Sequence, residues 1–197
     1  MRKNKTVSAS ICESRKIAMP DEINPHGTLF GGVIMSWIDK IAYMCAQNYA
    51  EWRKTVTVNI DNIQFIKPVF SGEHVALRAM VVSVGRSSME IDVTLYKEDP
   101  ITQEKELVGL AHLTFVSIGS DGKGRVVPEL ILESEEDLIR YNRAQLRLQK
   151  RLELKRLLED VGAEDHRVPL KNEIESKIFT LMNYGKMVTS RWRRLYE

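Results

Sequence analysis

The segment from Asn24 to Gln47, NPHGTLFGGVIMSWIDKIAYMCAQ, restricts the fold more than any other part of the chain. It begins as a turn and continues as a helix-forming stretch. One helical face carries Ile34, Trp37, Ile38, Ile41 and Cys45, and the flanks are small or apolar as well. A helix that is apolar on nearly every side is buried against other structure. Asp39 is the only carboxylate in this largely apolar segment.

Segments with strand patterns precede and follow this helix in the sequence. We predict strands at 6–17, 55–66, 75–84, 89–97 and 107–118, most of them rich in β-branched residues or alternating with a period of two. Turn residues separate the later strands from one another. The order of one strand, one helix and four strands predicts an α+β fold, in which a five-stranded antiparallel sheet wraps one long helix. Pairing of two copies would complete the burial of that helix.

The composition changes after Pro128, and we divide the chain into a domain at 1–130 and a helical extension at 131–197. The residues at 134–137 resemble a helix-capping box. Leucines at 154, 157 and 158 with Val161 form a stripe that Gly162 ends. Beyond Pro169, a second helical stretch is predicted at 172–196.

Composition and charge narrow the class of protein. The 197 residues include 43% hydrophobic side chains, enough for a proper core, and 29 basic residues balance 27 acidic ones. A net charge of +2 gives no reason to expect a nucleic-acid partner. Two isolated cysteines, Cys12 and Cys45, exclude a disulfide scaffold and fit a reducing compartment. Without a signal-peptide pattern or a membrane span, the expected location is the cytoplasm.

Asp39 has two interpretations. Removing a carboxylate from water into apolar surroundings is costly unless it is paired or used chemically. If its flank of the helix faces solvent, Asp39 is an ordinary surface acid. The flank carries no other charge, since it is shared with Gly32, Met35, Tyr43 and Ala46, and this favours a buried and functional carboxylate.

The start of the helix is a second candidate site. Glycines at 27, 31 and 32 permit close backbone approach. The first N–H groups of a helix lack intrahelical partners, so they can stabilise a carbonyl oxygen that becomes negatively charged. Asn24 could add a hydrogen bond to such an oxygen, or it could simply form the turn before Pro25.

Other motifs are weaker. The sequence GRSS at 85–88 is either a plain hairpin turn, with Gly85 at positive φ, or a phosphate clamp in which Arg86 and Ser87 donate hydrogen bonds. His26 and His112 are interpreted as a loop residue and a packing or cross-strand residue. Scattered histidines and cysteines show no metal-ligand spacing, and no GxSxG or P-loop motif occurs.

Four segments together resemble the acyl-CoA thioesterase branch of the hotdog-fold family. These are NPHGTLFGGVIMSWID at 24–39, VTVNIDNIQFIKPVFSGE at 56–73, VGRSSMEIDV at 84–93 and LVGLAHLTFVSIGSDGKGRVVPEL at 107–130. The resemblance covers about residues 6–130. It implies a central helix wrapped by an antiparallel sheet and paired protomers with active sites between them, commonly assembled as trimers of dimers.

The resemblance also implies roles for individual residues. Asn24 and the Gly31–Gly32 backbone would polarise the thioester, and Asp39 of the other protomer would act as general base or nucleophile. Burial would raise the pKa of that carboxyl toward a useful value. Met35 and Tyr43 would line the acyl tail. Arg86 and Ser87 would hold the nucleotide end of coenzyme A, which is part of the substrate, so that no separate cofactor or metal is implied.

Two other functions stay open at this point. A hotdog dehydratase acting on hydroxyacyl thioesters would use a histidine such as His26 near the helix start. A non-catalytic acyl-CoA or nucleotide sensor would transmit its signal through the helical extension. The final segment MVTSRWRRLYE could contact CoA phosphates, a partner chain or a membrane surface, or be a solvated tail. Asp61 matches a position that the family keeps acidic, and its role is left open.

Overall fold

The computed structural model describes residues 3–160 and divides into two compact units, one ending at Leu148 and one beginning at Gln149. The helix end predicted at Val161 and Gly162 and the second helical stretch at 172–196 lie outside the described residues. The elements in chain order are β1 (Asn4–Thr6), η1 (Ser8–Ser10), β2 (Cys12–Ile17), η2 (Pro20–Glu22), α1 (Gly31–Ala50), β3 (Thr55–Phe65), β4 (His74–Val84), β5 (Ser88–Glu98), β6 (Lys105–Ser117), β7 (Glu129–Ile131) and α2 (Glu135–Asp160).

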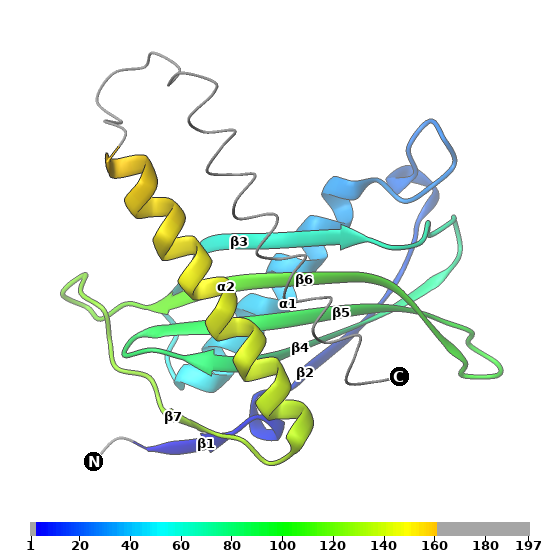
Figure 1. The fold of residues 1–197 in the computed structure, drawn as a ribbon. Helices are drawn as coiled ribbons and strands as arrows, with labels where there is room; N and C mark the ends of the chain where they lie inside the picture. The colour runs from blue at the N-terminus through cyan, green and yellow to red at the C-terminus, as the bar shows by residue number, and fades with distance from the viewer. Residues whose placement is uncertain (1–2, 161–197) are drawn as a thin grey trace, which may run out of the picture. The chain divides into compact units, whose positions relative to one another are not determined.

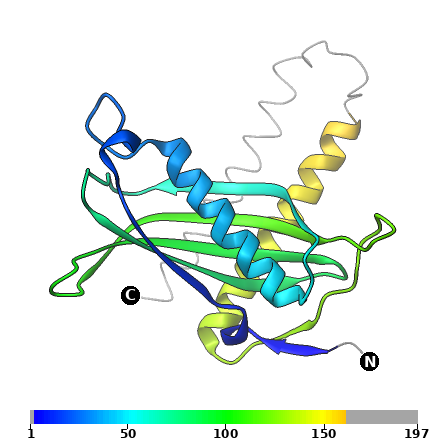
Figure 2. The ribbon, with the colours of Figure 1, turned by 180° about the vertical axis from the view of Figure 1, so that it is seen from behind.

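A five-stranded antiparallel sheet forms the body of the first unit, in the order β2-β4-β5-β6-β3. The 20-residue helix α1 lies along one face of this sheet and contacts all five strands (Figures 1 and 2). This is the predicted hotdog arrangement. The first and last residues predicted for the helix and for the last four strands differ from the observed ones by at most two positions.

The main core lies between α1 and the sheet. It contains alternate residues of β5 together with the inner face of α1: Ile38, Ile41, Ala42, Cys45, Met89, Ile91, Val93 and Leu95. All of these side chains are buried. Burying a side chain the size of Ile or Met contributes about 1.5–3 kcal/mol. The apolar residues that repeat every 3.6 positions in the helix and every two positions in the strand are therefore buried in the same core.

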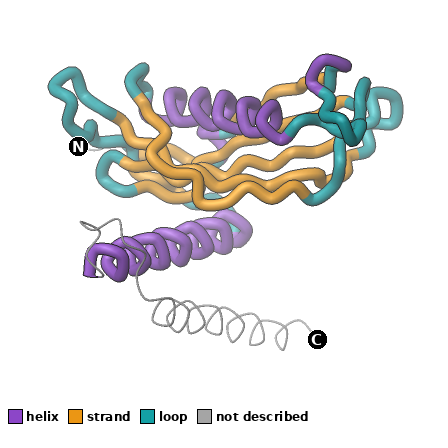
Figure 3. The backbone as a smooth tube through the Cα atoms, turned by 90° about the horizontal axis from the view of Figure 1, so that it is seen from above, coloured by secondary structure: helices purple, strands orange, loops and turns teal. Residues whose placement is uncertain are grey.

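The opposite face of the sheet carries polar side chains of β5, including Glu90 and Asp92, which are nonetheless buried. Up to Leu148, residues of α2 cover this face, and Ala144 packs with Met80 and Val82 in a second, small core cluster. Figure 3 shows the sheet between α1 and the start of α2. The described residues of the second unit, 149–160, continue the helix.

The sequence predicted one continuous strand over 6–17, but the structure does not contain one. A 3-10 turn at Ser8–Ser10 interrupts it, because the Ser10 hydroxyl donates to the Val7 carbonyl at 2.6 Å and accepts the Val81 N–H at 2.9 Å. The short strand before this turn, β1, pairs in parallel with β7, which the sequence pattern did not indicate.

Candidate functional site

The loop before α1 is closed by the side chain of Asn24. Its Oδ1 accepts the N–H groups of His26 at 2.9 Å and Thr28 at 3.2 Å, and its Nδ2 donates to the Thr28 hydroxyl at 2.9 Å. Gly27 adopts φ +83°, which favours glycine. Asn24 is therefore a turn-forming residue in this structure, as the simpler interpretation held. One Nδ2 hydrogen remains for another acceptor, since an amide has two.

Helix α1 begins with two N–H groups that have no hydrogen-bond partner among residues 3–160, those of Gly31 and Gly32. The N–H groups of Val33 and Ile34 are taken by the Phe30 carbonyl at 2.9 and 3.3 Å. Phe30 caps the helix without any side-chain hydrogen bond. The helix start can therefore donate two hydrogen bonds to an oxygen that approaches from outside, where the helix dipole also favours negative charge.

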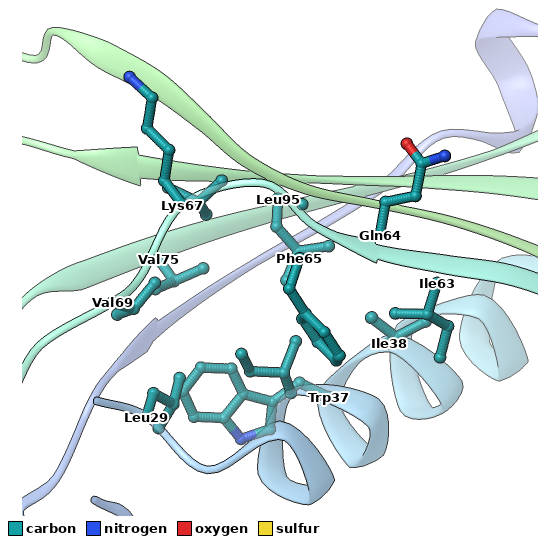
Figure 4. Close-up of a pocket in the computed structure, with 13 residues that line it drawn as sticks. Leu29, Trp37, Ile38, Ile63, Gln64, Phe65, Lys67, Val69, Val75 and Leu95 are labelled. Carbon is teal, nitrogen blue, oxygen red and sulfur yellow. The ribbon is translucent and has the colours of Figure 1, made fainter. Parts of the chain in front are cut away.

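An open pocket of about 370 Å³ lies at this end of α1, and its lining includes Asn24, Thr28, Gly31, Ile34 and Phe65. Next to it, an apolar slot between α1 and the strands leaves only about 10 Å³ free, roughly the space of one water. Figure 4 shows the ring of Phe65 pointing toward Trp37 across this slot. A substrate can approach the helix start, but the slot behind it is already filled by side chains.

Asp39 lies partly buried in the third turn of α1, where the Thr57 hydroxyl of β3 donates to its Oδ1 at 2.8 Å. This bond fixes one carboxylate oxygen and leaves the other for a further donor, such as a water. Sequence reasoning missed Thr57. The alternation of 55–66 marked a strand, but nothing in the sequence shows which of its hydroxyls lies opposite the helix.

Within one protomer, Asp39 lies far from the N–H groups at the start of α1. At about 1.5 Å per residue, seven residues of α1 place Asp39 roughly 10 Å along the axis from Gly32. One carboxylate cannot act on a carbonyl held by N–H groups at that distance. The structure thus positions both groups well but does not bring them together within one chain.

The flank of α1 around Asp39 is apolar and open. Met35 is 45% exposed and Tyr43 is 39% exposed, and the Tyr43 hydroxyl accepts a hydrogen bond from Gln47 at 2.8 Å. Alternate residues of β3, which is an edge strand, are exposed as well, namely Val56, Val58 and Ile60. An unpaired edge beside an apolar helix flank is typical of a surface that another chain covers.

The turn between β4 and β5 presents Arg86 to solvent, and its guanidinium has no ion-pair partner within the described range 3–160. The backbone carbonyls of Arg86 and Ser87 accept the N–H groups of Val127 and Ser117 at 3.0 and 2.9 Å. Gly85 does not adopt positive φ, so that expectation was wrong. A Cβ at this position would lie 2.5 Å from the Ser88 Oγ, so a larger residue would require the Ser88 hydroxyl to rotate away.

Neither of the histidines weighed as candidates lines the open pocket at the start of α1. His112 of β6 contacts Asp92 of β5 across the strands at 2.7 Å, which is the cross-strand role predicted for it. His26 is exposed in the loop. Among residues 3–160, no three His, Cys, Asp or Glu side chains are arranged to hold a metal ion. No helix of the same range is long and apolar enough to cross a membrane.

Comparison with known proteins decides the family. The sequence model that describes the Thioesterase superfamily matches residues 26–103 of this chain. The chain is 38% identical over 156 residues to YkhA of Bacillus subtilis (strain 168), described as an uncharacterised acyl-CoA thioester hydrolase, and the match covers 77% of this chain and 90% of YkhA. The chain belongs to the acyl-CoA thioester hydrolases of the thioesterase superfamily.

Solved structures of such hydrolases share the fold of this one. The acyl-CoA hydrolase of Staphylococcus aureus, in complex with butyryl coenzyme A, coenzyme A and coenzyme A disulfide, has a TM-score of 0.72 and 33% identity, covering 79% of this chain and 96% of that one. It has also been solved as variants with an Asp, an Asn or a Thr replaced by Ala. A hexameric acyl-CoA thioesterase has a TM-score of 0.73 and 29% identity, covering 78% and 97%.

Proposed function

We propose that this hydrolase cleaves acyl-CoA to a free carboxylic acid and coenzyme A at a site built by two protomers. The Gly31 and Gly32 N–H groups of one protomer, with Asn24, would bind the thioester oxygen, and Asp39 of the other protomer would act on the carbonyl carbon. The observation that carries this proposal is the separation of roughly 10 Å between Asp39 and Gly32 along α1. The open flank of Asp39 is the surface that a second copy would cover.

Asp39 would activate a water as general base or attack the carbonyl itself. The hydrogen bond from Thr57 supports either role, because it orients the carboxylate and leaves one oxygen for the reaction. The negative charge that develops on the thioester oxygen would lie at the positive end of the α1 dipole. The S. aureus variants replace the same three residue types, Asp, Asn and Thr, that stand at these positions here.

The two ends of the substrate would be held by different surfaces. The acyl tail would run along Met35 and Tyr43, which stand one turn before and after Asp39, since the slot behind Phe65 has no free room for it. Arg86 and the turn residue Ser87 would bind the nucleotide phosphates, because an exposed and unpaired guanidinium forms charge-assisted hydrogen bonds with them. Coenzyme A enters as part of the substrate, and the proposed chemistry requires no other cofactor or metal.

The assembly would be a homo-oligomer of hotdog dimers, with three dimers forming a hexamer. The open β3 edge and the apolar α1 flank support pairing of two copies, and the hexameric neighbour supports the larger assembly. We also propose a cytoplasmic location, which the two free thiols Cys12 and Cys45 support. The domain division at 130 and 131 remains a proposal about which part of the chain carries the reaction.

Mixed dimers test the shared site directly. Asn24→Ala and Asp39→Ala protomers, co-expressed with different tags and purified over both tags, should recover up to about half of the wild-type rate, because each dimer of unlike protomers in the assembly has one of its two sites intact. Each variant alone should stay nearly inactive. Thiol release from a short-chain acyl-CoA measures the rate. Mixed dimers as inactive as the parents would contradict a shared site and leave a site within one protomer.

The two glycines of the helix start should respond differently to alanine. A Cβ at Gly32 would lie 2.7 Å from the Phe30 ring, whereas one at Gly31 would lie 3.6 Å from Phe65, an ordinary contact. We therefore expect Gly32→Ala to push the exposed Phe30 ring aside at the helix start and to lower kcat/KM by about tenfold, less than removal of an oxyanion donor, because the alanine keeps its N–H group. The matched control Gly31→Ala should stay within about threefold. Equal losses in both variants would contradict the expectation that the contact with Phe30, present only at position 32, disturbs the helix start.

A further inference from the structure

The two cysteines lie side by side although 33 positions separate them in the chain. Cys12 begins β2, and Cys45 lies in the fourth turn of α1. The Cys45 Sγ donates to the Ser10 carbonyl at 3.1 Å, and the Asn48 Nδ2 donates to the Cys12 Sγ at 3.3 Å. One turn of the helix therefore contacts both ends of the segment 10–12, and the partly buried Cys12 packs against the core cluster that contains Cys45.

Their accessibility is unequal. The Cys45 side chain is completely buried, whereas Cys12 is partly exposed, and both are free thiols. A reagent in solution can reach only the Cys12 sulfur. The proposed hydrolytic mechanism uses neither residue, since the reacting groups lie at the start of α1 and around Asp39.

Their protonation is unequal too. A hydrogen bond from the Cys45 thiol lowers the pKa of Cys12 to about 6, with a smaller contribution from Asn48, although partial burial opposes the shift. The same pairing and burial raise the pKa of Cys45. Cys45 has one proton, which it can give to the Ser10 carbonyl or to the Cys12 sulfur, and the second orientation stabilises a Cys12 thiolate. The exposed sulfur is therefore the nucleophile of the pair.

We propose that Cys12 and Cys45 form an oxidisable dithiol site that takes a low-molecular-weight disulfide as its oxidant. The Cys12 thiolate attacks one sulfur of the disulfide, whose S–S bond breaks as a mixed disulfide with Cys12 forms and one thiolate leaves. Cys45 then loses its proton and attacks the Cys12 sulfur, which expels the second thiolate. The protein dithiol is oxidised by two electrons, the small disulfide is reduced to two thiols, and the two protein protons end on those thiols.

The partner cysteine, rather than the reactivity of Cys12 alone, distinguishes this site. Compared with an ordinary thiol, a pKa near 6 raises the thiolate fraction at pH 7 by roughly 30-fold, but the lower nucleophilicity removes roughly tenfold of that gain. Attack on the mixed disulfide is intramolecular, so Cys45 resolves it without a second collision. The product is a bond between α1 and the edge strand β2.

Mass spectrometry of the intact, folded, reduced protein tests the proposal, with oxidised glutathione as the probe. The wild-type chain should lose two hydrogens and keep no glutathione, and peptide mapping should find Cys12 linked to Cys45. Cys45→Ser should accumulate one glutathione on Cys12, because nothing resolves the mixed disulfide. Cys12→Ser should stay unmodified while folded and become modified after unfolding in urea, since its remaining thiol is buried.

Three outcomes would overturn the proposal. These are a stable glutathione adduct on the wild-type chain, modification of folded Cys12→Ser at the wild-type rate, and a wild-type chain that does not react. A thermal melt of each reduced variant shows whether it is folded before the reaction. Thiol release from acyl-CoA by Cys12→Ser should match the wild type whatever the oxidation result, so failure of this proposal and failure of the proposed hydrolytic site are distinguishable.

Discussion

Replacing Asp39 with alanine is expected to lower kcat for acyl-CoA hydrolysis by about a thousandfold, within the range typical for loss of a general base. Substrate binding should change less, because the proposed phosphate and acyl contacts remain. The variant should fold, since alanine favours a helix more than aspartate does and only the hydrogen bond from Thr57 is lost. Thiol release from a short-chain acyl-CoA, measured over a range of concentrations, gives kcat and KM separately.

Asp21→Ala is the matched control, because this carboxylate is exposed in the short helix η2 before the site loop. Its kcat should stay close to that of the wild type. Asp39→Asn keeps the shape of the side chain and the contact to Thr57 but removes the charge, so it should lose nearly as much activity as the alanine variant. If Asp39→Asn kept most of the activity, the carboxylate would be a structural group and the proposed mechanism would be wrong.

The sequence predicts the body of this fold because two periodicities agree. Ile34, Ile38, Ile41 and Cys45 repeat at helical spacing, and the strand residues alternate, so each pattern has one arrangement that buries its apolar side. The failures are local. The 3-10 turn at Ser8–Ser10 depends on a hydroxyl that bonds to Val81, which is distant in sequence. No short-range pattern encodes such a contact.

The candidate site is predictable to a smaller degree. The position of Asp39 in an apolar helix and the glycines at its start are visible in the sequence, because both violate the expectation for an ordinary buried helix. Thr57 is not visible, because its contact with Asp39 depends on how β3 is positioned against α1. The register of that strand is set by pairing with β6 and shifts between Thr57 and Asn59, which alternation alone does not reveal.

The second large effect concerns stability. Asp92 of β5 is only 8% exposed, and its Oδ1 lies 2.7 Å from the His112 Nδ1 and 2.8 Å from an Arg147 guanidinium nitrogen. Asp92→Ala would leave the Arg147 side chain, itself 19% exposed, without the carboxylate that compensates its burial. We expect the free energy of unfolding to fall by about 3 kcal/mol, as for buried ion pairs that lose one member. Urea denaturation followed by tryptophan fluorescence, at one protein concentration, measures it.

A double-mutant cycle separates the ion pair from the other effects of the substitution. If Arg147→Met removes the charge that Asp92 compensates, the double variant Asp92→Ala, Arg147→Met should recover part of the stability lost in Asp92→Ala, because no unpaired guanidinium remains. Glu13→Ala is the control at an exposed pair, since the Glu13 carboxylate lies 3.7 Å from Arg78 at the surface, and its stability should hardly change. Additive losses at 92 and 147 would mean that the two side chains stabilise the fold independently. In that case the covering of the outer sheet face by the start of α2 would rest on the apolar cluster around Ala144 and the hydrogen bond from Gln145 to Ser83.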